Sequence, residues 1–170
     1  LGMIGVMALG NPLVAVPPPH MKDGHRTWNA SLPADDVLTK QFRLGPEDLG
    51  PKADGCSVVK QILQDGIRTG VETIEIDNGK IRFIVLPTRG MGIWQAHCGD
   101  VRLGWDSPVQ GPVHPVFVYL DEPSGLGWLA GFDEMLVRCG LEYNGGPEFK
   151  DDGVLRYGLH GRIANIPAHD

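Results

Sequence analysis

Polar side chains that could bind a ligand or move a proton gather in the last third of the sequence, between glycines and prolines. They are Asp133, Glu134, Arg138, Glu142, Asn144, Glu148, His160, Arg162, Asn165 and His169. Such groups lie on loops and strand ends more often than in a core. Brought into one cleft, their imidazole, guanidinium and amide groups could hydrogen-bond the hydroxyl groups of a sugar. Taken singly, each is better explained as a loop cap or a surface ion pair, so the clustering carries the hypothesis.

His160 is the strongest single candidate, because an imidazole can donate or accept a proton near neutral pH. Gly161 would let a ligand approach the backbone closely, and Arg162 offers a rigid fork of donors. An aromatic side chain could cover the C–H face of the ligand, and the candidates are Trp94, Trp105, Trp128 and Tyr143. The alternative for His160 is a structural histidine satisfied by a backbone carbonyl.

Metal chemistry is a competing interpretation of the same residues. His160 and His169 could combine with Glu142 or Glu148 into a two-histidine, one-carboxylate site. The sequence has no His-x-His pair and no His-Glu-x-x-His run, so we expect no metal. Nucleotide-binding glycine loops and the Gly-x-Ser-x-Gly elbow of serine hydrolases are missing as well, and we expect no cofactor.

Short β-branched runs separated by turn residues predict the strands that would position these groups. The expected strands are residues 57–64, 71–76, 81–85, 93–98, 101–105 and 116–120. Asn78-Gly79 predicts a type I′ turn between the second and third of them. Residues 132–138 suit either a strand or a short helix, and no window predicts a long amphipathic helix. The pattern indicates an all-β fold, an antiparallel sandwich or barrel.

Composition supports that fold class and narrows the ligand. The 170 residues include 24 glycines and 14 prolines, a supply of turn residues that favours short strands. The net charge of -6 disfavours a nucleic-acid partner and favours a neutral small ligand.

Location is predicted from the cysteines and the apolar segments. Three widely spaced cysteines, at 56, 98 and 139, predict reduced, mostly buried thiols and a cytoplasmic protein. No segment supplies the roughly 20 apolar residues of a membrane span, so we expect no membrane contact. Residues 1–16 could instead be the remnant of a secretory signal, although they lack a basic start.

Five motifs in order carry a resemblance to a known family. They are LPTRGMGI at 86–93, LGWDSP at 103–108, GWLAGF at 127–132, CGLE at 139–142 and LHGR at 159–162. Together they resemble an uncharacterised branch, a domain of unknown function, of the aldose 1-epimerase or galactose mutarotase-like superfamily. The resemblance covers residues 57–170. It implies an antiparallel β-sandwich of the galactose mutarotase-like (supersandwich) type that binds a monosaccharide or a sugar derivative.

The resemblance also assigns residues. His160 matches the histidine of the superfamily's Leu-His-Gly-Gly motif, which lies in the sugar pocket, and Arg138 resembles its sugar-binding arginine. We take Arg138, Asn144, His160, Arg162, Asn165 and His169 as substrate-binding candidates and His160 as the catalytic candidate. Arg162 replaces the second glycine of the motif, which suggests a charged or differently held sugar. His169 lies too near His160 to match the superfamily's acid, and its catalytic glutamate would lie beyond Asp170.

We therefore expect residues 1–55 to be an irregular lead-in and residues 56–170 to be the N-terminal part of a mutarotase-like sandwich, incomplete in this chain. Such a piece would leave apolar sheet surface exposed. The leading hypothesis is a carbohydrate-binding protein that interconverts anomers or epimers of an aldose when full length. A non-catalytic sugar-recognition or regulatory domain is the alternative, and a metal-dependent sugar isomerase is a third hypothesis. The sequence does not predict an oligomeric state.

Overall fold

The computed structural model describes residues 20–22, 25–27 and 41–168. Strands and turns dominate this part of the chain, and its one α-helix, α1 (Pro46–Leu49), has four residues. Six strands form an antiparallel sheet in the order β3-β4-β5-β6-β7-β8. These strands are β3 (Phe42–Leu44), β4 (Ser57–Ile62), β5 (Glu72–Asp77), β6 (Ile81–Leu86), β7 (Gly92–Cys98) and β8 (Val101–Leu103). The prediction of an all-β antiparallel fold is confirmed.

Two small hairpins stand apart from this sheet. One joins β1 (His20–Lys22) to β2 (His25–Thr27), and the other joins β9 (Glu148–Phe149) to β10 (Leu155–Tyr157). Five 3-10 turns connect the larger elements: η1 (Gly66–Arg68), η2 (Pro87–Arg89), η3 (Pro115–Phe117), η4 (Gly127–Gly131) and η5 (Ile163–Asn165). β3 lies inside the segment that we expected to be an irregular lead-in, and it pairs with β4 along the edge of the sheet.

The hairpin of β5 and β6 is the one that alternation predicts, but its turn differs. Ile74 pairs with Val85 and Ile76 with Phe83, which places four apolar side chains on one face. A type I′ turn needs a positive φ at two central residues. Here Gly79 has a φ of 79°, whereas Asn78 is not among the residues with positive φ. The Asn78 side chain instead accepts from the amide of Ile81 at 2.8 Å, so the turn is closed by a side chain.

One face of the sheet is apolar, and it is only partly covered near β8. Residues directly opposite each other share a face, so Leu103 lies on the same face as Ala96 and Phe83. Ala96 is buried, whereas Leu103 is 39% exposed and Val101, two pairs further along and therefore on the same face, is 62% exposed. The structure thus has exposed apolar side chains at this edge of the sheet.

Two local expectations of secondary structure are wrong. Residues 116–120 do not form a strand, because Pro115 starts the 3-10 turn η3 and the amides of Phe117 and Val118 bond back to His114 and Pro115. Residues 132–138 are neither strand nor helix. They follow the open edge of β7, where the amide of Met135 donates to the carbonyl of Ile93 at 2.9 Å.

The cysteines also differ from expectation. All three are free, but Cys98 and Cys139 are exposed and Cys56 is half-buried.

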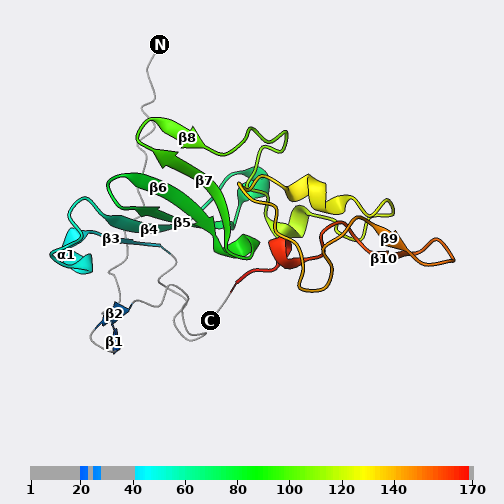
Figure 1. Ribbon diagram of the computed structural model, residues 1–170, viewed down its shortest axis with the longest axis horizontal. Helices are drawn as coiled ribbons and strands as arrows, with labels where there is room; N and C mark the ends of the chain where they lie inside the picture. Colours follow the sequence, from blue (N-terminus) through cyan, green and yellow to red (C-terminus); the bar gives the residue numbers. More distant parts are fainter. Residues whose placement is uncertain (1–19, 23–24, 28–40, 169–170) are drawn as a thin grey trace, which may run out of the picture.

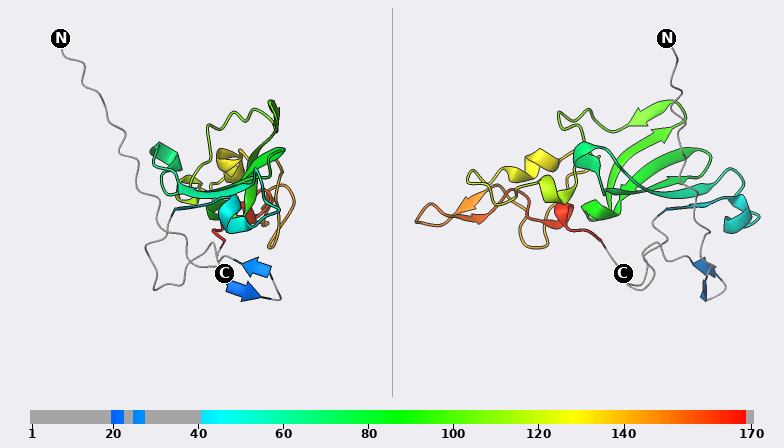
Figure 2. Two further views of the ribbon diagram at one scale, coloured as in Figure 1. Left: turned by 90° about the vertical axis from the view of Figure 1, so that its left-hand side faces the viewer. Right: turned by 180° about the vertical axis from the view of Figure 1, so that it is seen from behind.

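The loops and 3-10 turns of residues 104–168 extend from one end of the large sheet, with β9 and β10 farthest from it (Figures 1 and 2). They meet the sheet where β6 ends, at η2, and where β7 begins. The amide of Ala168 donates to the carbonyl of Pro87 at 2.9 Å, so the end of the described chain returns to this junction. Within the described residues, no helix is long and apolar enough to cross a membrane.

Candidate functional site

A buried ionic network lies at the junction between the sheet and the loops. Its centre is Arg89, the last residue of η2, which is 1% exposed. The Arg89 Nε donates to Glu134 Oε1 at 2.7 Å, and its Nη1 donates to Asn165 Oδ1 at 2.9 Å and to the Val113 carbonyl at 3.0 Å. Glu134 is also 1% exposed. Three segments far apart in the sequence are therefore joined by one guanidinium.

Arg138 extends the network. Its Nη1 donates to the Gly90 carbonyl at 2.6 Å, its Nη2 to the Arg89 carbonyl at 2.7 Å, and Nη2 also lies 3.3 Å from Glu134 Oε1. Burial lowers the pKa of Arg138, and the Glu134 carboxylate opposes this shift. Two guanidinium groups thus share one carboxylate, and the network carries an excess of positive charge.

Glycine makes the close approach of these groups possible. Gly90 ends η2 in the left-handed region, with φ 56°. A Cβ atom on Gly90 would lie 2.2 Å from the Ile163 carbonyl oxygen, and one on Gly92 would lie 2.6 Å from Arg138 Nη2. The glycines of the segment 86–93 therefore let η5 and Arg138 pack directly on the backbone of the sheet.

Three buried donors at this end of the molecule have no hydrogen-bond partner among the described residues. They are Trp128 Nε1, Arg138 Nε and Asn165 Nδ2. Trp128 is 3% exposed and Asn165 is 9% exposed. Buried polar groups are nearly always paired, so each such donor calls for an oxygen acceptor.

His160 is held in an unusual backbone conformation. Its φ is 59°, and in the described chain only Met91 is another non-glycine residue with a positive φ. The His160 amide donates to the Gly145 carbonyl at 2.9 Å, and its carbonyl accepts from the Gly140 amide at 3.2 Å. Left-handed backbone in a residue of this kind costs on the order of 1 kcal/mol, and it persists where the surroundings enforce it.

The imidazole of His160 packs against an aromatic row. It meets the edge of Trp128 at 4.8 Å between centroids, and Trp128 stacks on Phe132 at 4.5 Å. Phe132 in turn contacts Trp105 at 5.2 Å. His160 Nδ1 lies 3.5 Å from the Asn144 carbonyl oxygen. A carbonyl only accepts, so this contact favours the tautomer with the proton on Nδ1 and leaves the Nε2 lone pair for another partner.

The six predicted binding residues fall in different places. Arg138 and Asn165 belong to the ionic network, and His160 packs on Trp128 and touches the backbone of the exposed Asn144. Arg162 lines a separate pocket, where it pairs with Asp121 and Glu142. His169 lies outside the described residues.

Sequence reasoning missed Arg89 as a site residue. Its signal was a charged side chain three residues after the end of the apolar strand β6 and directly before Gly90. In the described part of the chain, no group of three or more His, Cys, Asp or Glu residues is placed to hold a metal ion.

Asp133 lies beside the network and is held by Trp94, whose Nε1 donates to Asp133 Oδ2 at 2.9 Å. Burial raises the pKa of Asp133 above its ordinary value of 3.8, although the bond from Trp94 opposes the shift. The folded protein therefore binds this proton more tightly than the unfolded chain does. The protonated Asp133 carboxyl therefore stabilises the folded protein at a pH below its ordinary pKa. This stabilisation is lost as the pH rises through the raised pKa of the folded state.

We expect Asp133→Asn to remove this pH dependence. Asparagine keeps an oxygen acceptor for Trp94 but does not titrate. The free energy of unfolding of the variant minus that of the unaltered protein should increase as the pH rises from about 4 to about 7. Urea denaturation at each pH would measure this difference. Asp151→Asn, an exposed change in the β9–β10 hairpin, is the control and should give the same difference at every pH. A flat difference for Asp133→Asn would contradict the expectation.

The fold and the site together define an antiparallel β protein with a buried donor-rich junction, and comparisons with known proteins place it in a family. Residues 68–170 match the model of DUF4432, a domain of unknown function, and the chain belongs to this family. No curated protein matches the chain at a significant level.

One solved structure is similar over most of the chain. It is the crystal structure of a "putative aldose 1-epimerase" from Klebsiella pneumoniae, with 35% sequence identity and a TM-score of 0.73. The match covers 83% of this chain and 36% of the Klebsiella chain. The chain thus spans about a third of the length of that relative. The predicted resemblance to an aldose 1-epimerase-like branch of unknown function is confirmed.

Proposed function

We propose that this chain carries the sugar-binding part of an aldose 1-epimerase-like protein and that His160 contacts the sugar. The likeness to the Klebsiella protein supports an epimerase-like, carbohydrate-related function in coarse terms. The observation that carries the proposal is the left-handed backbone of His160, held by two backbone hydrogen bonds. Strained non-glycine residues gather at functional sites, where the strain fixes a side chain in a working position.

The surroundings of His160 suit a neutral polyol. Its Nε2 can accept a hydrogen bond from a hydroxyl group, while Trp128 provides an aromatic edge beside it. Arg89 and Glu134 would position Arg138 rather than touch the sugar, since both are buried.

Interconversion of anomers requires two proton transfers. A base removes the proton of the anomeric hydroxyl, an acid protonates the ring oxygen, the bond from C1 to the ring oxygen breaks, and the ring closes again on the other face. In this proposal His160 holds a hydrogen bond to the sugar near these atoms. The full-length protein would supply the remaining acid or base.

A non-catalytic sugar-recognition domain is the second candidate, and one observation favours it. Glu134 is the carboxylate of the network, and it is engaged by both Arg89 and Arg138. Glu134 is also 1% exposed, so a substrate hydroxyl cannot reach this carboxylate in the folded chain. The described residues therefore provide groups that can bind a sugar, but they do not provide a complete acid-base pair.

The test compares His160→Ala with His97→Ala, a histidine of β7. Ligand-observed NMR would measure the Kd of free aldoses, and exchange NMR would measure the rate at which their anomers interconvert. We expect His160→Ala to weaken aldose binding about tenfold, as the loss of one good hydrogen bond to a ligand predicts, and His97→Ala to leave it unchanged. Equal affinity in His160→Ala and the unaltered protein would remove His160 from the site. Binding without accelerated exchange would favour the recognition domain.

A further inference from the structure

A pocket separate from the surroundings of the His160 side chain lies on the outer side of the loop region, at the base of the β9–β10 hairpin. Its cavity volume is about 380 Å³, within the range of about 300–1,000 Å³ that small-molecule sites occupy. Three stretches of chain line it: residues 120–123, residues 142–143, and residues 153–162 without His160. The His160 imidazole therefore belongs to a different environment, although Gly161 and Arg162 of the same turn line this pocket.

The pocket is held in shape by short-range contacts. The Leu159 amide donates to the Gly125 carbonyl at 2.8 Å. Gly161, at φ 70°, packs so closely that a Cβ atom would lie 2.5 Å from the Tyr143 carbonyl oxygen. The rings of Tyr143 and Tyr157 stack at 4.8 Å with 14° between their planes. These contacts give the pocket a preformed wall that a ligand would not have to order.

Charge decides which ligands fit. Arg162 pairs through Nη2 with Asp121 and lies, through Nε, 3.5 Å from Glu142 Oε2. Arg156, the second cation of the lining, pairs with Glu148 at 3.0 Å. Arg162, Asp121 and Glu142 together carry a net charge of minus one. Both guanidinium groups of the lining are already paired within the described chain. An anionic ligand would meet the repulsion of the carboxylates and would have to compete with them for the guanidinium groups.

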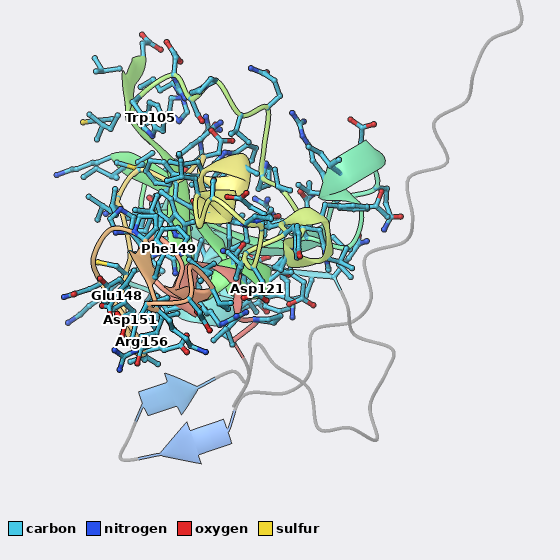
Figure 3. The ribbon with its side chains drawn as sticks, turned by 90° about the vertical axis from the view of Figure 1, so that its right-hand side faces the viewer. Trp105, Asp121, Glu148, Phe149, Asp151 and Arg156 are labelled. Atoms are coloured by element: carbon cyan, nitrogen blue, oxygen red, sulfur yellow. The ribbon has the colours of Figure 1, made fainter. Side chains whose placement is uncertain are left out.

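The two carboxylates remain open to a neutral ligand. Asp121 is 63% exposed and Glu142 is 52% exposed, and each carboxylate can accept about four hydrogen bonds. Figure 3 shows the charged residues of the hairpin, among them Arg156, close together, with Asp121 to one side of them. A ring that bears neighbouring hydroxyl groups could donate to these carboxylates while its C–H groups cover Leu155.

We propose that this pocket is a second carbohydrate site, which accepts a neutral sugar ring through Asp121 and Glu142 and rejects an anionic one. The inference goes beyond the function proposed for His160, whose side chain does not line the pocket. It also assigns a role to Arg162. The guanidinium does not bind a charged sugar, because its two carboxylates neutralise it. Its role is to orient these carboxylates.

The test uses two sets of probes that cannot open their rings. The neutral set is the methyl glycosides of glucose, galactose and mannose. The anionic set is the methyl glycosides of the matching uronic acids, which carry a carboxylate at C6. Affinities would be measured by ligand-observed NMR for the unaltered chain, for Asp121→Asn with Glu142→Gln, for the control Asp151→Asn, and for His160→Ala, which removes the group proposed to bind sugar at the other site. Circular dichroism would show that each variant is folded.

We expect at least one neutral glycoside to bind, and each uronide to bind at least about tenfold more weakly than its neutral counterpart. The double variant should weaken neutral binding at least about tenfold. It should also gain affinity for uronides, because it frees Arg162 from both partners. Asp151→Asn should leave these affinities unchanged, and neutral binding that depends on Asp121 and Glu142 should persist in His160→Ala.

Three outcomes would overturn the inference. They are no binding of any neutral glycoside, equal affinity for the uronides, or neutral binding that survives the double variant. If neutral binding is lost in His160→Ala and kept in the double variant, the site at His160 stands and the second site does not.

Discussion

Glu134→Gln is expected to lower the free energy of unfolding by about 3–5 kcal/mol, the cost of breaking a buried ion pair from one side. Glutamine keeps the shape of the side chain but removes its charge. Arg89 and Arg138 would then face each other in the interior without a neutralising carboxylate. The change would be measured by urea denaturation followed through tryptophan fluorescence.

Glu148→Gln is the matched control for that experiment. Glu148 also pairs with an arginine, Arg156 at 3.0 Å, but the side chains are 40% and 55% exposed. Solvent-exposed ion pairs contribute less than about 1 kcal/mol, so this variant should unfold at nearly the same urea concentration as the unaltered protein. Similar losses for both variants would show that burial of the Glu134 pair has no special weight.

Gly90→Ala is expected to destabilise the fold by about 2–5 kcal/mol, through two effects that add. The residue has a φ of 56°, where a Cβ atom costs about 1–2 kcal/mol. The same atom would lie 2.2 Å from the Ile163 carbonyl oxygen, and forced shifts in packed structure cost a further 1–3 kcal/mol or so. Thermal or urea unfolding would measure the loss.

Gly99→Ala separates the two effects. Gly99 has a φ of 55°, almost identical to that of Gly90, but nothing lies within 4 Å of the Cβ atom it would gain. This variant should lose only the backbone component, about 1–2 kcal/mol. If the two variants lost equal stability, the close approach of η5 to the sheet would not be a constraint on Gly90.

The sequence was informative where neighbours in the chain become neighbours in space. Alternation of Ile74 and Ile76 with polar residues, followed by Asn78-Gly79, predicted the β5–β6 hairpin, because a hairpin pairs residues only a few positions apart. The type of turn escaped prediction, since the choice depends on whether the Asn78 side chain bonds the backbone. The prediction of a strand at residues 116–120 was wrong for a related reason. β-Branched residues favour a strand only where a partner strand is present.

The candidate site could be predicted only in part. Clustering of polar residues pointed to the last third of the chain, which contains Glu134, Arg138 and Asn165 of the network, and the motif at 159–162 singled out His160. The network could not be predicted, because Arg89 meets partners 45 and 76 residues away along the chain. Alternation carries no information about contacts at that range. The placement of Arg162 away from His160 depends on the two left-handed residues at the turn, which only the backbone reveals.

The carbonyls of Arg89 and Gly90, where the sheet ends, accept from Arg138, and the side chain of Arg89 reaches Asn165. The loops and this end of the sheet should therefore open together rather than fray separately, as one cooperative unit in hydrogen exchange. A sugar that binds at Arg138 or Asn165 would then be thermodynamically linked to the sheet itself. A sugar bound at the loops would raise the hydrogen-exchange protection of backbone amides in β6 and β7, which lie outside the proposed sugar contacts.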